Sequence, residues 1–588
     1  MIRRDTMPPR ISLPPIVNTL LASSVLSTGL AQDQEAEDLL LNYQRIDEAM
    51  MHAPPAEDWL MWRSHYDLSG HSELDLIDIG NVSDLRQVWS VPLSEGGNMT
   101  TPLVHDGVMF IADTNNILLA LDAHDGKELW RYEHESEVFD GRRQGIALFG
   151  DMVFVPHNDL DIVALNVRSG SVVWETSITT PVEPMQGYYG LRGAPMVADD
   201  MLIQGVTATM VPEGGFIVGL DLETGAEQWR FHTVARPSGL GGETWNNLPL
   251  EARSGGSVWN SGSYDADLGL VYFGAAPTYD TGPLLADLGI KGVTNDALFT
   301  NSTMALRPRT GELVWHFQHM PNDQLDLDWV YERQLDELEI QGRSRKVVFT
   351  AGKMALYDVI DAETGEYLES IDLGLQNIVS RVDSETGAKS INPDSIPNKE
   401  ANHLLCPYFL GGRNWQAGAY NPNTKMLYLP ALEMCMMAGL MADGRLLSTG
   451  IEATPTPRAD SDGKFGRLQA INMETMKMTW RHRESSPPST PLLSTAGGLI
   501  FGGNLDNSFK AFDAQSGEVL WKTTMDHLPS SFPITYAVNG KQYVAVVKGQ
   551  PSTWTWSLYG ITQELLGPET RSTPTPNGKP ELVVFAVE

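Results

Sequence analysis

Three aspartates near the middle of the chain are the side chains best placed to do chemistry. Asp323, Asp326 and Asp328 lie within six positions of one another in the run H-M-P-N-D-Q-L-D-L-D. A carboxylate beside a hydroxyl group can act as a base and remove its proton. Acids on loops are more often solvated surface groups, so the neighbouring motifs must decide between these two interpretations.

Two other residues stand out from their surroundings. Lys353 interrupts the apolar strand K-V-V-F-T-A-G-K-M-A-L-Y, and Trp259 lies outside the frame of the tryptophans described below. A fixed cation can stabilise negative charge that develops on a ligand. Indole offers the broadest aromatic surface for a flat ligand. The alternatives are an exposed strand lysine and a tryptophan that only packs between structural elements.

A repeated unit must position these residues. Seven copies combine a short apolar strand, a turn that ends in Thr-Gly or Ser-Gly in most of them, and a second strand, as in A-F-D-A-Q-S-G-E-V-L-W. The copies end at Trp130, Trp174, Trp229, Trp315, Glu369, Trp480 and Trp521, and we count Trp89 as a degenerate eighth. Asp bonds the backbone that follows it and Gly accepts positive φ, so each copy predicts a hairpin.

The spacing of the copies indicates the fold. Most copies are 41 to 55 residues apart, which is typical of a four-stranded propeller blade. The two wider spacings, 86 and 111 residues, would hold an extra blade or long loops. The recurrent Trp is expected to dock one blade onto the next. We therefore predict an all-β protein, an eight-bladed β-propeller of four-stranded antiparallel blades, with one domain over residues 32–570 and a C-terminal tail over 571–588.

Residues 1–31 are typical of an export signal, and a disordered tail is the alternative. The signal-like features are Arg3, Arg4 and Arg10, an apolar run over 16–30 and the small-x-small end Gly29-Leu30-Ala31. No other segment is apolar enough to span a bilayer. The net charge of −34 disfavours binding to nucleic acid or to an anionic membrane, and it would suit a basic partner protein.

Several motifs together resemble the pyrroloquinoline-quinone (PQQ) dependent alcohol dehydrogenases, a family that also includes membrane glucose dehydrogenase. They are D-W-L-M-W-R-S-H-Y-D-L-S-G-H-S, the segment G-G-S-V-W-N-S-G-S-Y-D-A-D from Gly255, the aspartate cluster, the Lys353 strand and L-G-G-R-N-W-Q-A-G-A-Y. The resemblance covers about residues 55–560. It implies a propeller quinoprotein that oxidises a primary or secondary alcohol, a polyol or a bulkier hydroxylated compound to the carbonyl, with PQQ as hydride acceptor.

The resemblance also implies residue roles. Asp326 would be the catalytic base, although Leu325 stands where the family usually has Trp. Trp259 would lie flat under the quinone. The cofactor-binding residues would be Trp259, Lys353, Asn414, Arg143, Ser257 and Trp415. Related enzymes carry a disulfide at the spacing of Cys406 and Cys435, and an even cysteine count suits an exported chain.

The expected metal is a divalent or trivalent ion, with calcium first, bound at Asp326 and Asp328. Met210 replaces the family's metal-binding Glu, and the segment around Ala275 lacks its Asn. Calcium needs six to eight oxygen ligands. Either groups such as Asp328, Glu213 or Asp280 supply them, or the metal is bound differently, or activity is lost.

Other departures concern the cofactor's upper face and the route of the electrons. The family's adjacent cysteines are missing around Phe139, so Phe139 or another side chain would cover the quinone. No C-x-x-C-H occurs, so electrons would leave to a separate acceptor, expected to be a periplasmic cytochrome c. We therefore expect a periplasmic enzyme. The alternative is a propeller without cofactor that acts as a binding or assembly scaffold in the cell envelope.

Overall fold

The computed structural model describes residues 37–588 apart from 137, 139–141, 183–187, 280–283, 285, 324, 397–400, 441–450, 551 and 567–577. The chain divides into two compact units, Met1–Tyr43 and Gln44–Glu588, and the strands reported below all belong to the second. The predicted export signal at 1–31 lies outside the described residues. None of the helices in the described ranges is both long and apolar enough to cross a membrane.

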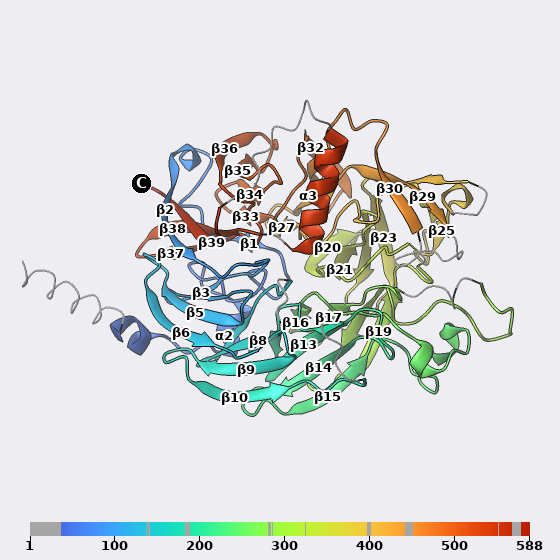
Figure 1. Ribbon diagram of the computed structural model, residues 1–588, viewed down its shortest axis with the longest axis horizontal. Coiled ribbons are helices and arrows are strands. Elements are labelled where there is room, and N and C mark those ends of the chain that lie inside the picture. The colour runs from blue at the N-terminus through green and yellow to red at the C-terminus, as the bar shows by residue number, and fades with distance from the viewer. Residues whose placement is uncertain are drawn as a thin grey trace, which may run out of the picture. The chain divides into compact units, whose positions relative to one another are not determined.

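Within the described part of Gln44–Glu588, eight antiparallel sheets with four strands at their core follow one another around a ring (Figure 1). Blade 1 holds β3 (Leu103–His105), β4 (Val108–Ala112), β5 (Ile117–Asp122) and β6 (Glu128–Glu133). Blade 2 holds β7 (Ala147–Phe149), β8 (Met152–Pro156), β9 (Asp161–Asn166) and β10 (Val172–Ser177). Blade 3 holds β12 (Met196–Ala198), β13 (Met201–Ala208), β14 (Phe216–Asp221) and β15 (Glu227–His232), and β11 (Tyr189–Gly190) also pairs with β13.

The next four blades repeat this plan. Blade 4 holds β16 (Ser263–Asp265), β17 (Leu270–Gly274), β18 (Ser302–Leu306) and β19 (Leu313–Gln318), and blade 5 holds β20 (Gln334–Ile340), β21 (Arg343–Ala351), β22 (Leu356–Asp361) and β23 (Tyr367–Asp372). Blade 6 holds β27 (Ala419–Asn421), β28 (Met426–Leu432), β31 (Gly466–Asn472) and β32 (Lys477–Glu484). Blade 7 holds β33 (Leu493–Thr495), β34 (Leu499–Gly503), β35 (Ser508–Asp513) and β36 (Val519–Thr524), with β1 (His71–Ser72) parallel to β33.

Blade 8 closes the ring with strands from both ends of the second unit. It holds β37 (Ile534–Val538), β38 (Lys541–Lys548), β39 (Glu581–Val587) and β2 (Leu85–Pro92). β39 lies between β2 and β38 and pairs with both. The predicted C-terminal tail over 571–588 is therefore wrong at its end, because the buried run 582–586 is an inner strand of a blade.

The recurrent tryptophans dock neighbouring blades, as predicted. The Trp174 indole nitrogen of blade 2 donates a hydrogen bond to the Leu222 carbonyl of blade 3, at 2.9 Å. Its ring covers Gly225, where an added Cβ would lie 2.5 Å from the indole and where φ is +70°. Trp521 of blade 7 bonds the Leu85 carbonyl of blade 8 in the same way, at 3.1 Å. The turn glycine is thus required both by its φ and by the indole above it.

The wide spacings between repeats hold insertions. The 86-residue spacing contains the loops around η2 (Gly242–Trp245) and η3 (Leu250–Ala252). The 111-residue spacing contains a hairpin of β24 (Val379–Val382) and β25 (Lys389–Ile391), followed by η5 (Pro393–Ser395). It also contains a separate sheet of β26 (His403–Leu405), β29 (Met434–Leu440) and β30 (Ile451–Pro457). Two further short helices are α2 (Glu48–His52) and η1 (Val82–Asp84). The expected Cys406–Cys435 disulfide ties the end of β26 to β29.

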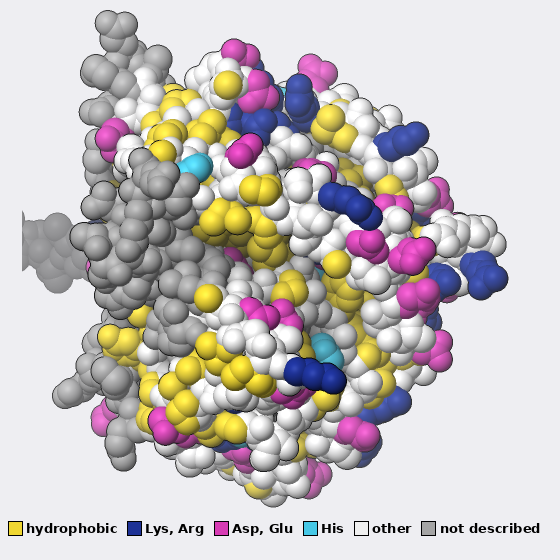
Figure 2. Space-filling view, turned by 90° about the vertical axis from the view of Figure 1, so that its right-hand side faces the viewer, with side chains coloured by type: hydrophobic (Ala, Val, Ile, Leu, Met, Phe, Trp, Pro, Cys, Tyr) yellow, Lys and Arg dark blue, Asp and Glu magenta, His cyan; other side chains and the backbone are white. Residues whose placement is uncertain are grey.

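A longer helix, α3 (Thr553–Leu566), packs beside this inserted sheet (Figure 1). Its buried Leu558 belongs to the same apolar cluster as Met434 and Met436 of β29. Figure 2 shows the side of the molecule that lies on the right in Figure 1, where β25 and β29 are labelled. Basic and acidic side chains are interspersed on that face, so the negative net charge does not make it uniformly acidic.

Candidate active site

A cavity of about 420 Å³ brings together most of the residues expected to bind a cofactor. Its lining includes Trp259, Asp328, Lys353, Asn414 and Trp415. These side chains come from the segment before blade 4, from the loop between blades 4 and 5, from the turn after β21 and from the segment before blade 6. Ligand cavities are typically of this size or somewhat larger. Segments far apart in sequence therefore meet in one place suited to a small molecule.

A lysine between two carboxylates forms the charged part of the site. The Lys353 ammonium nitrogen lies 3.0 Å from Asp326 Oδ2 and 2.8 Å from Asp328 Oδ2. The Lys353 amide also donates to the Asp328 carbonyl at 2.9 Å. The Lys353 stem runs so close to Gly411 that a Cβ added there would lie 3.0 Å from it. This glycine belongs to the L-G-G-R-N-W motif, so the motif leaves space for the lysine.

Asp326 combines an unusual backbone conformation with a raised carboxyl pKa. Its backbone φ is +58°, in the left-handed region that residues other than glycine seldom adopt. Its Oδ1 atom is buried and has no hydrogen-bond partner among the described residues. Burial raises the pKa of the Asp326 carboxyl, Lys353 opposes this rise and Asp328 adds to it, and the net shift is upward. A buried carboxyl with one free oxygen and a raised pKa is suited to proton transfer.

The charge of Lys353 is fixed by the same pair of acids. Burial alone would lower the pKa of its ammonium, but Asp326 and Asp328 outweigh burial and raise it. Asp328 is itself 5% exposed and receives a weak hydrogen bond from the Tyr279 hydroxyl at 3.4 Å. The site therefore presents a permanent positive charge to the cavity.

A stack of buried groups supports Trp259 at the cavity. The Tyr331 ring meets the Trp259 indole edge to face, with centroids 5.2 Å apart. The Arg413 guanidinium lies over Tyr331 at 4.8 Å and pairs with Glu332 at 2.5 Å. All three supporting side chains are at most 1% exposed. Packing of this kind holds an indole in one orientation, as a floor for a flat ligand requires.

The predicted residues Asn414 and Trp415 line the cavity, and Ser257 lies behind its wall. Asn414 donates to the Leu410 carbonyl at 3.0 Å and accepts from the Trp415 amide at 2.7 Å. The Trp415 indole nitrogen is buried without a partner among the described residues. The Ser257 hydroxyl accepts a bond from the Ala208 amide at 3.1 Å and does not line the cavity. Asn414 is thus fixed in place, and Trp415 keeps a donor free.

Arg143 does not lie where it was expected. Its guanidinium is 4% exposed and donates to the carbonyls of Asp113 and Pro156 and to the Asn116 side chain. The adjacent Arg142 lines the cavity instead. Of the doublet R-R, the first residue therefore faces the cavity and the second is held by the backbone of blades 1 and 2.

Sequence reasoning missed several other lining residues. They are Gln144, Arg192, Thr209, Tyr279, Phe409 and Trp554. Arg192 and Tyr279 sit in loops without a distinctive motif, and Trp554 begins α3, an element outside the repeats. Phe139 and Asp280, which we expected to cover the cofactor and to complete the metal site, lie outside the described residues.

The described residues do not form a calcium site at the cavity. Met210 is 49% exposed, and Glu213 pairs with Arg236 at 3.3 Å. Ala275 is buried and has no side-chain oxygen. Asp326 and Asp328 already hold the Lys353 ammonium, and the neighbouring Asp323 accepts hydrogen bonds from the Leu325 and Leu327 amides. Two carboxylates around a fixed cation fall short of the six to eight oxygens that calcium requires.

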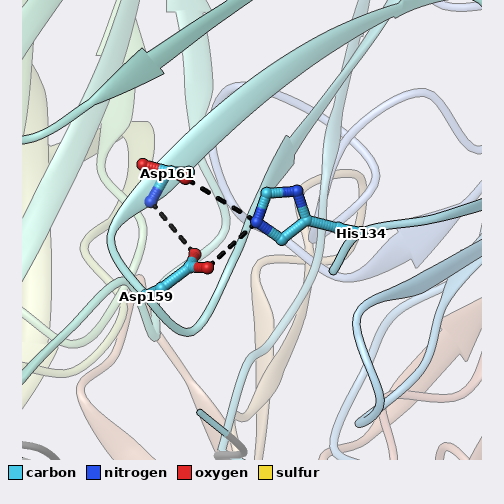
Figure 3. A group of neighbouring side chains, drawn as sticks. All are labelled: His134, Asp159 and Asp161. Atoms are coloured by element: carbon cyan, nitrogen blue, oxygen red, sulfur yellow. Dashed lines mark hydrogen bonds and ion pairs between the residues drawn. The ribbon is translucent and has the colours of Figure 1, made fainter. Parts of the chain in front are cut away.

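Elsewhere in the described chain, one group of potential metal ligands lies at the junction of blades 1 and 2 (Figure 3). His134 Nε2 is 3.0 Å from Asp159 Oδ2 and 3.7 Å from Asp161 Oδ2. Figure 3 shows both carboxylates turned toward the imidazole. None of the three residues is among those that line the cavity, and hydrogen bonding between the two blades explains the group.

Comparisons with known proteins agree with the fold and the site. The family model described as "Glucose/ethanol/alcohol dehydrogenase, beta-propeller domain" of PQQ enzymes matches residues 59–373 and 455–544. The chain therefore belongs to the PQQ-dependent alcohol dehydrogenase family and is an oxidoreductase of that family.

Individual relatives support this assignment. The chain is 30% identical over 573 residues to quinohemoprotein alcohol dehydrogenase ADH IIB of Pseudomonas putida, covering 92% of this chain and 80% of that protein. It is 30% identical over 588 residues to the dehydrogenase subunit of the quinone alcohol dehydrogenase of Komagataeibacter europaeus, covering 93% and 79%. The crystal structure of the Comamonas testosteroni quinohemoprotein alcohol dehydrogenase superposes with a TM-score of 0.81 at 26% identity, covering 95% and 84%.

Proposed function

We propose that this protein is a periplasmic quinoprotein dehydrogenase that oxidises a primary or secondary alcohol to the carbonyl, with PQQ as the hydride acceptor. The observation that carries the proposal is the meeting of Trp259, Lys353, Asn414 and Asp328 around one cavity, with Asp326 paired to Lys353. A propeller that served only as a scaffold would need none of these side chains at its centre. The relatives, which are alcohol dehydrogenases by name, likewise do not favour the scaffold alternative.

The lining of the cavity fits PQQ, which is a flat, fused-ring quinone with carboxylate groups. Arg142, Arg192 and Lys353 supply positive charge for the carboxylates and the quinone oxygens. Trp259, buttressed by Tyr331, offers a flat apolar surface to the rings. When bound, PQQ would accept the hydride from the alcohol carbon.

Proton transfer is the step that this chain's own residues perform. Asp326 would accept the hydroxyl proton of the alcohol on its free Oδ1 atom, since Oδ2 is held by Lys353. Because Lys353 also contacts Asp328, its ammonium stays in place while the charge on Asp326 changes. We propose that Lys353 and Asn414 orient the quinone, and that Arg142 takes the role first assigned to Arg143.

The expected calcium ion is not supported by the described donor set, so no part of the mechanism is assigned to a metal. The acceptor of the electrons would be a separate protein, for which we propose a periplasmic cytochrome c. The net charge of −34 would favour a basic cytochrome. The export signal over 1–31 is part of the same proposal, since a periplasmic acceptor requires a periplasmic enzyme.

Reconstitution of the purified protein tests the proposal directly. PQQ would be added alone, or with calcium, magnesium or a lanthanide, and dye reduction would be followed with a panel of primary, secondary and polyhydric alcohols. We expect PQQ-dependent turnover of at least one alcohol. Absence of both PQQ binding and turnover under every metal condition would support the scaffold instead. Omission of PQQ, with all other components present, is the matched control.

A further inference from the structure

A second cluster of buried charges packs against Trp329, the residue that follows Asp328 in the sequence. The Lys389 ammonium and the His319 Nδ1 atom each lie 2.7 Å from Asp358 Oδ2. All three side chains are 0% exposed. The Ser370 hydroxyl donates to the other Asp358 oxygen at 2.6 Å, and His319 Nε2 bonds the Thr303 hydroxyl at 2.8 Å. Both oxygens of Asp358 and both ring nitrogens of His319 are therefore hydrogen-bonded.

The ionisation of the cluster suits this arrangement. Burial tends to raise the pKa of Asp358, but Lys389 and the hydrogen bond from His319 outweigh it and lower the pKa. Burial lowers the pKa of His319 to about 4, so the ring is neutral at pH 7. The cluster thus holds one carboxylate, one ammonium and one neutral imidazole.

Two members of the cluster lie against Trp329. The His319 ring stacks on the Trp329 indole at 4.4 Å with an interplanar angle of 6°. The Lys389 ammonium lies over the same indole at 4.9 Å, a distance at which a cation is attracted to an aromatic face. Trp329 is 0% exposed and also contacts Gly352, where an added Cβ would lie 2.6 Å from the indole.

Trp329 connects the cluster to the active site through the backbone. It follows Asp328 directly in the sequence, and Gly352 directly precedes Lys353. The Trp329 amide donates to the Asn301 side chain at 3.1 Å, which fixes the backbone at that point. One indole therefore sits between the two segments whose side chains form the Asp326–Lys353–Asp328 arrangement.

The lysine of the cluster comes from an insertion. Lys389 opens β25, in a hairpin that pairs with no other sheet. The hairpin turn D-S-E-T-G repeats the blade motif, and Gly387 receives the Tyr367 ring as other turn glycines receive a Trp. The eight blades close without this hairpin. Burying the Lys389 ammonium is costly unless it is well paired. Because the ring closes without this hairpin, closure of the ring does not explain why Lys389 is buried here.

We propose that Lys389, together with Asp358 and His319, is a positioning group that clamps Trp329 and so sets the geometry of Asp326, Asp328 and Lys353. The proposal rests on the proposed dehydrogenase function. Lys389 touches neither the cavity nor its ligand, so it acts on the reaction through Trp329 alone. Loss of the clamp should misplace Asp326 relative to Lys353 and leave Trp259, Arg142 and Arg192 in place.

The test compares Lys389→Met and Lys389→Arg in the full chain with wild type. Lys389→Met keeps the length and apolar stem of the side chain but removes the charge that binds Asp358 and the indole. We expect kcat to fall about 10-fold to 100-fold, the range seen when a supporting contact of a site is lost, with KM and PQQ affinity nearly unchanged. Lys389→Arg should restore much of kcat, because it returns the cation. A fall in stability with unchanged kcat in Lys389→Met would overturn the proposal.

Two controls separate this inference from the function on which it rests. Lys346→Met removes an ammonium from blade 5, the blade that holds Asp358. Lys346 pairs there with Asp265 and Asp267, and its loss should leave kcat unchanged. Crystal structures of wild type and Lys389→Met give a readout that does not need turnover. We expect Asp326 to move out of contact with Lys353 in the variant. An unmoved Asp326 would refute the clamp, whereas an inactive wild type would refute only the proposed function.

Discussion

Tryptophans pack both at the rim of the ring and at its centre, but their contacts differ between the two regions. At the rim, Trp174 and Trp521 make the same contact, an indole over a neighbouring blade with its nitrogen bonded to a carbonyl there. At the centre, the indole nitrogens of Trp329 and Trp415 are buried without a partner in the described part of the chain, and each ring has neighbours of its own.

This difference predicts where a substitution should lower stability and where it should lower activity. The rim contact is repeated around the ring, so the loss of one copy should lower stability and leave the cavity unchanged. The central contacts occur once each, and they position groups that do chemistry. Substitutions there should change activity more than stability. The predictions below test this division, from the largest expected effect to the smallest.

Removal of residues 581–588 should be the most damaging change, because it deletes an inner strand. β39 pairs with β2 on one side and β38 on the other, so its loss leaves β2 without a partner and exposes one edge of β38, which keeps β37. We expect no cooperative thermal transition by circular dichroism and aggregation in size-exclusion chromatography. Removal of the exposed Glu588 alone is the control and should be neutral. A truncated protein that melts as wild type does would show that blade 8 is not needed for closure.

Asp326→Asn should have the largest effect on activity. Asn keeps the shape of the side chain but cannot accept the proton, so kcat should fall about 10³-fold. Burial raises the pKa of Asp326, which means that folding disfavours its charged form, and the neutral Asn should not lower the melting temperature. PQQ affinity should change little. Wild-type kcat in this variant would show that another group is the base.

Trp174→Ala should show the opposite pattern. The side chain is 8% exposed and covers Gly225, so its removal should lower the free energy of unfolding by about 3–5 kcal/mol. The kcat of the remaining folded protein should equal that of wild type. Trp556→Ala is the matched control, because that indole is 46% exposed on α3. Chemical denaturation and steady-state kinetics on the same samples measure both. A loss of kcat without a loss of stability in Trp174→Ala would contradict the expected difference between rim and centre.

The rim could be predicted from the sequence because its contacts are local. The Asp, the Thr-Gly or Ser-Gly tip and the Trp of one repeat lie within about one hairpin, and the spacing gave the eight blades. β39 was missed, although its run L-V-V-F-A is a strand signal, because no repeat copy surrounds it. The turn at 383–387 was missed for the opposite reason, since it carries the repeat motif without a Trp.

The centre could be predicted only where a family motif names the residue. Asp326, Lys353, Asn414 and Trp259 were proposed in that way. Lys353, Asn414 and Trp259 line the cavity, and Asp326 pairs with Lys353. Arg192, from a loop before blade 3, has no such motif. The contact of Lys389 with Trp329 joins residues 60 positions apart through an insertion, and no periodicity in the sequence records it. Contacts that are used once leave no repeated pattern.

Acid sensitivity gives the smallest expected effect, and one of its sources, His157, does not line the cavity. His157 follows β8, is 0% exposed, and has no hydrogen-bond partner for either ring nitrogen among the described residues. Burial, together with Arg143 and His134, lowers its pKa to about 2. Below the usual histidine pKa of about 6.5, the unfolded chain therefore binds a proton that the folded chain does not, and stability falls as pH falls.

Between pH 6.5 and pH 5 this single histidine should lower the free energy of unfolding by about 2 kcal/mol. His157→Gln removes the titrating group, so the variant should lose about 2 kcal/mol less than wild type over the same interval, whatever its stability at pH 7. Urea denaturation at several pH values measures the slope. His52→Gln, at an exposed position in α2, should keep the wild-type slope. If His157→Gln also keeps that slope, His157 is not a source of the acid sensitivity of the fold, and other buried groups must supply it.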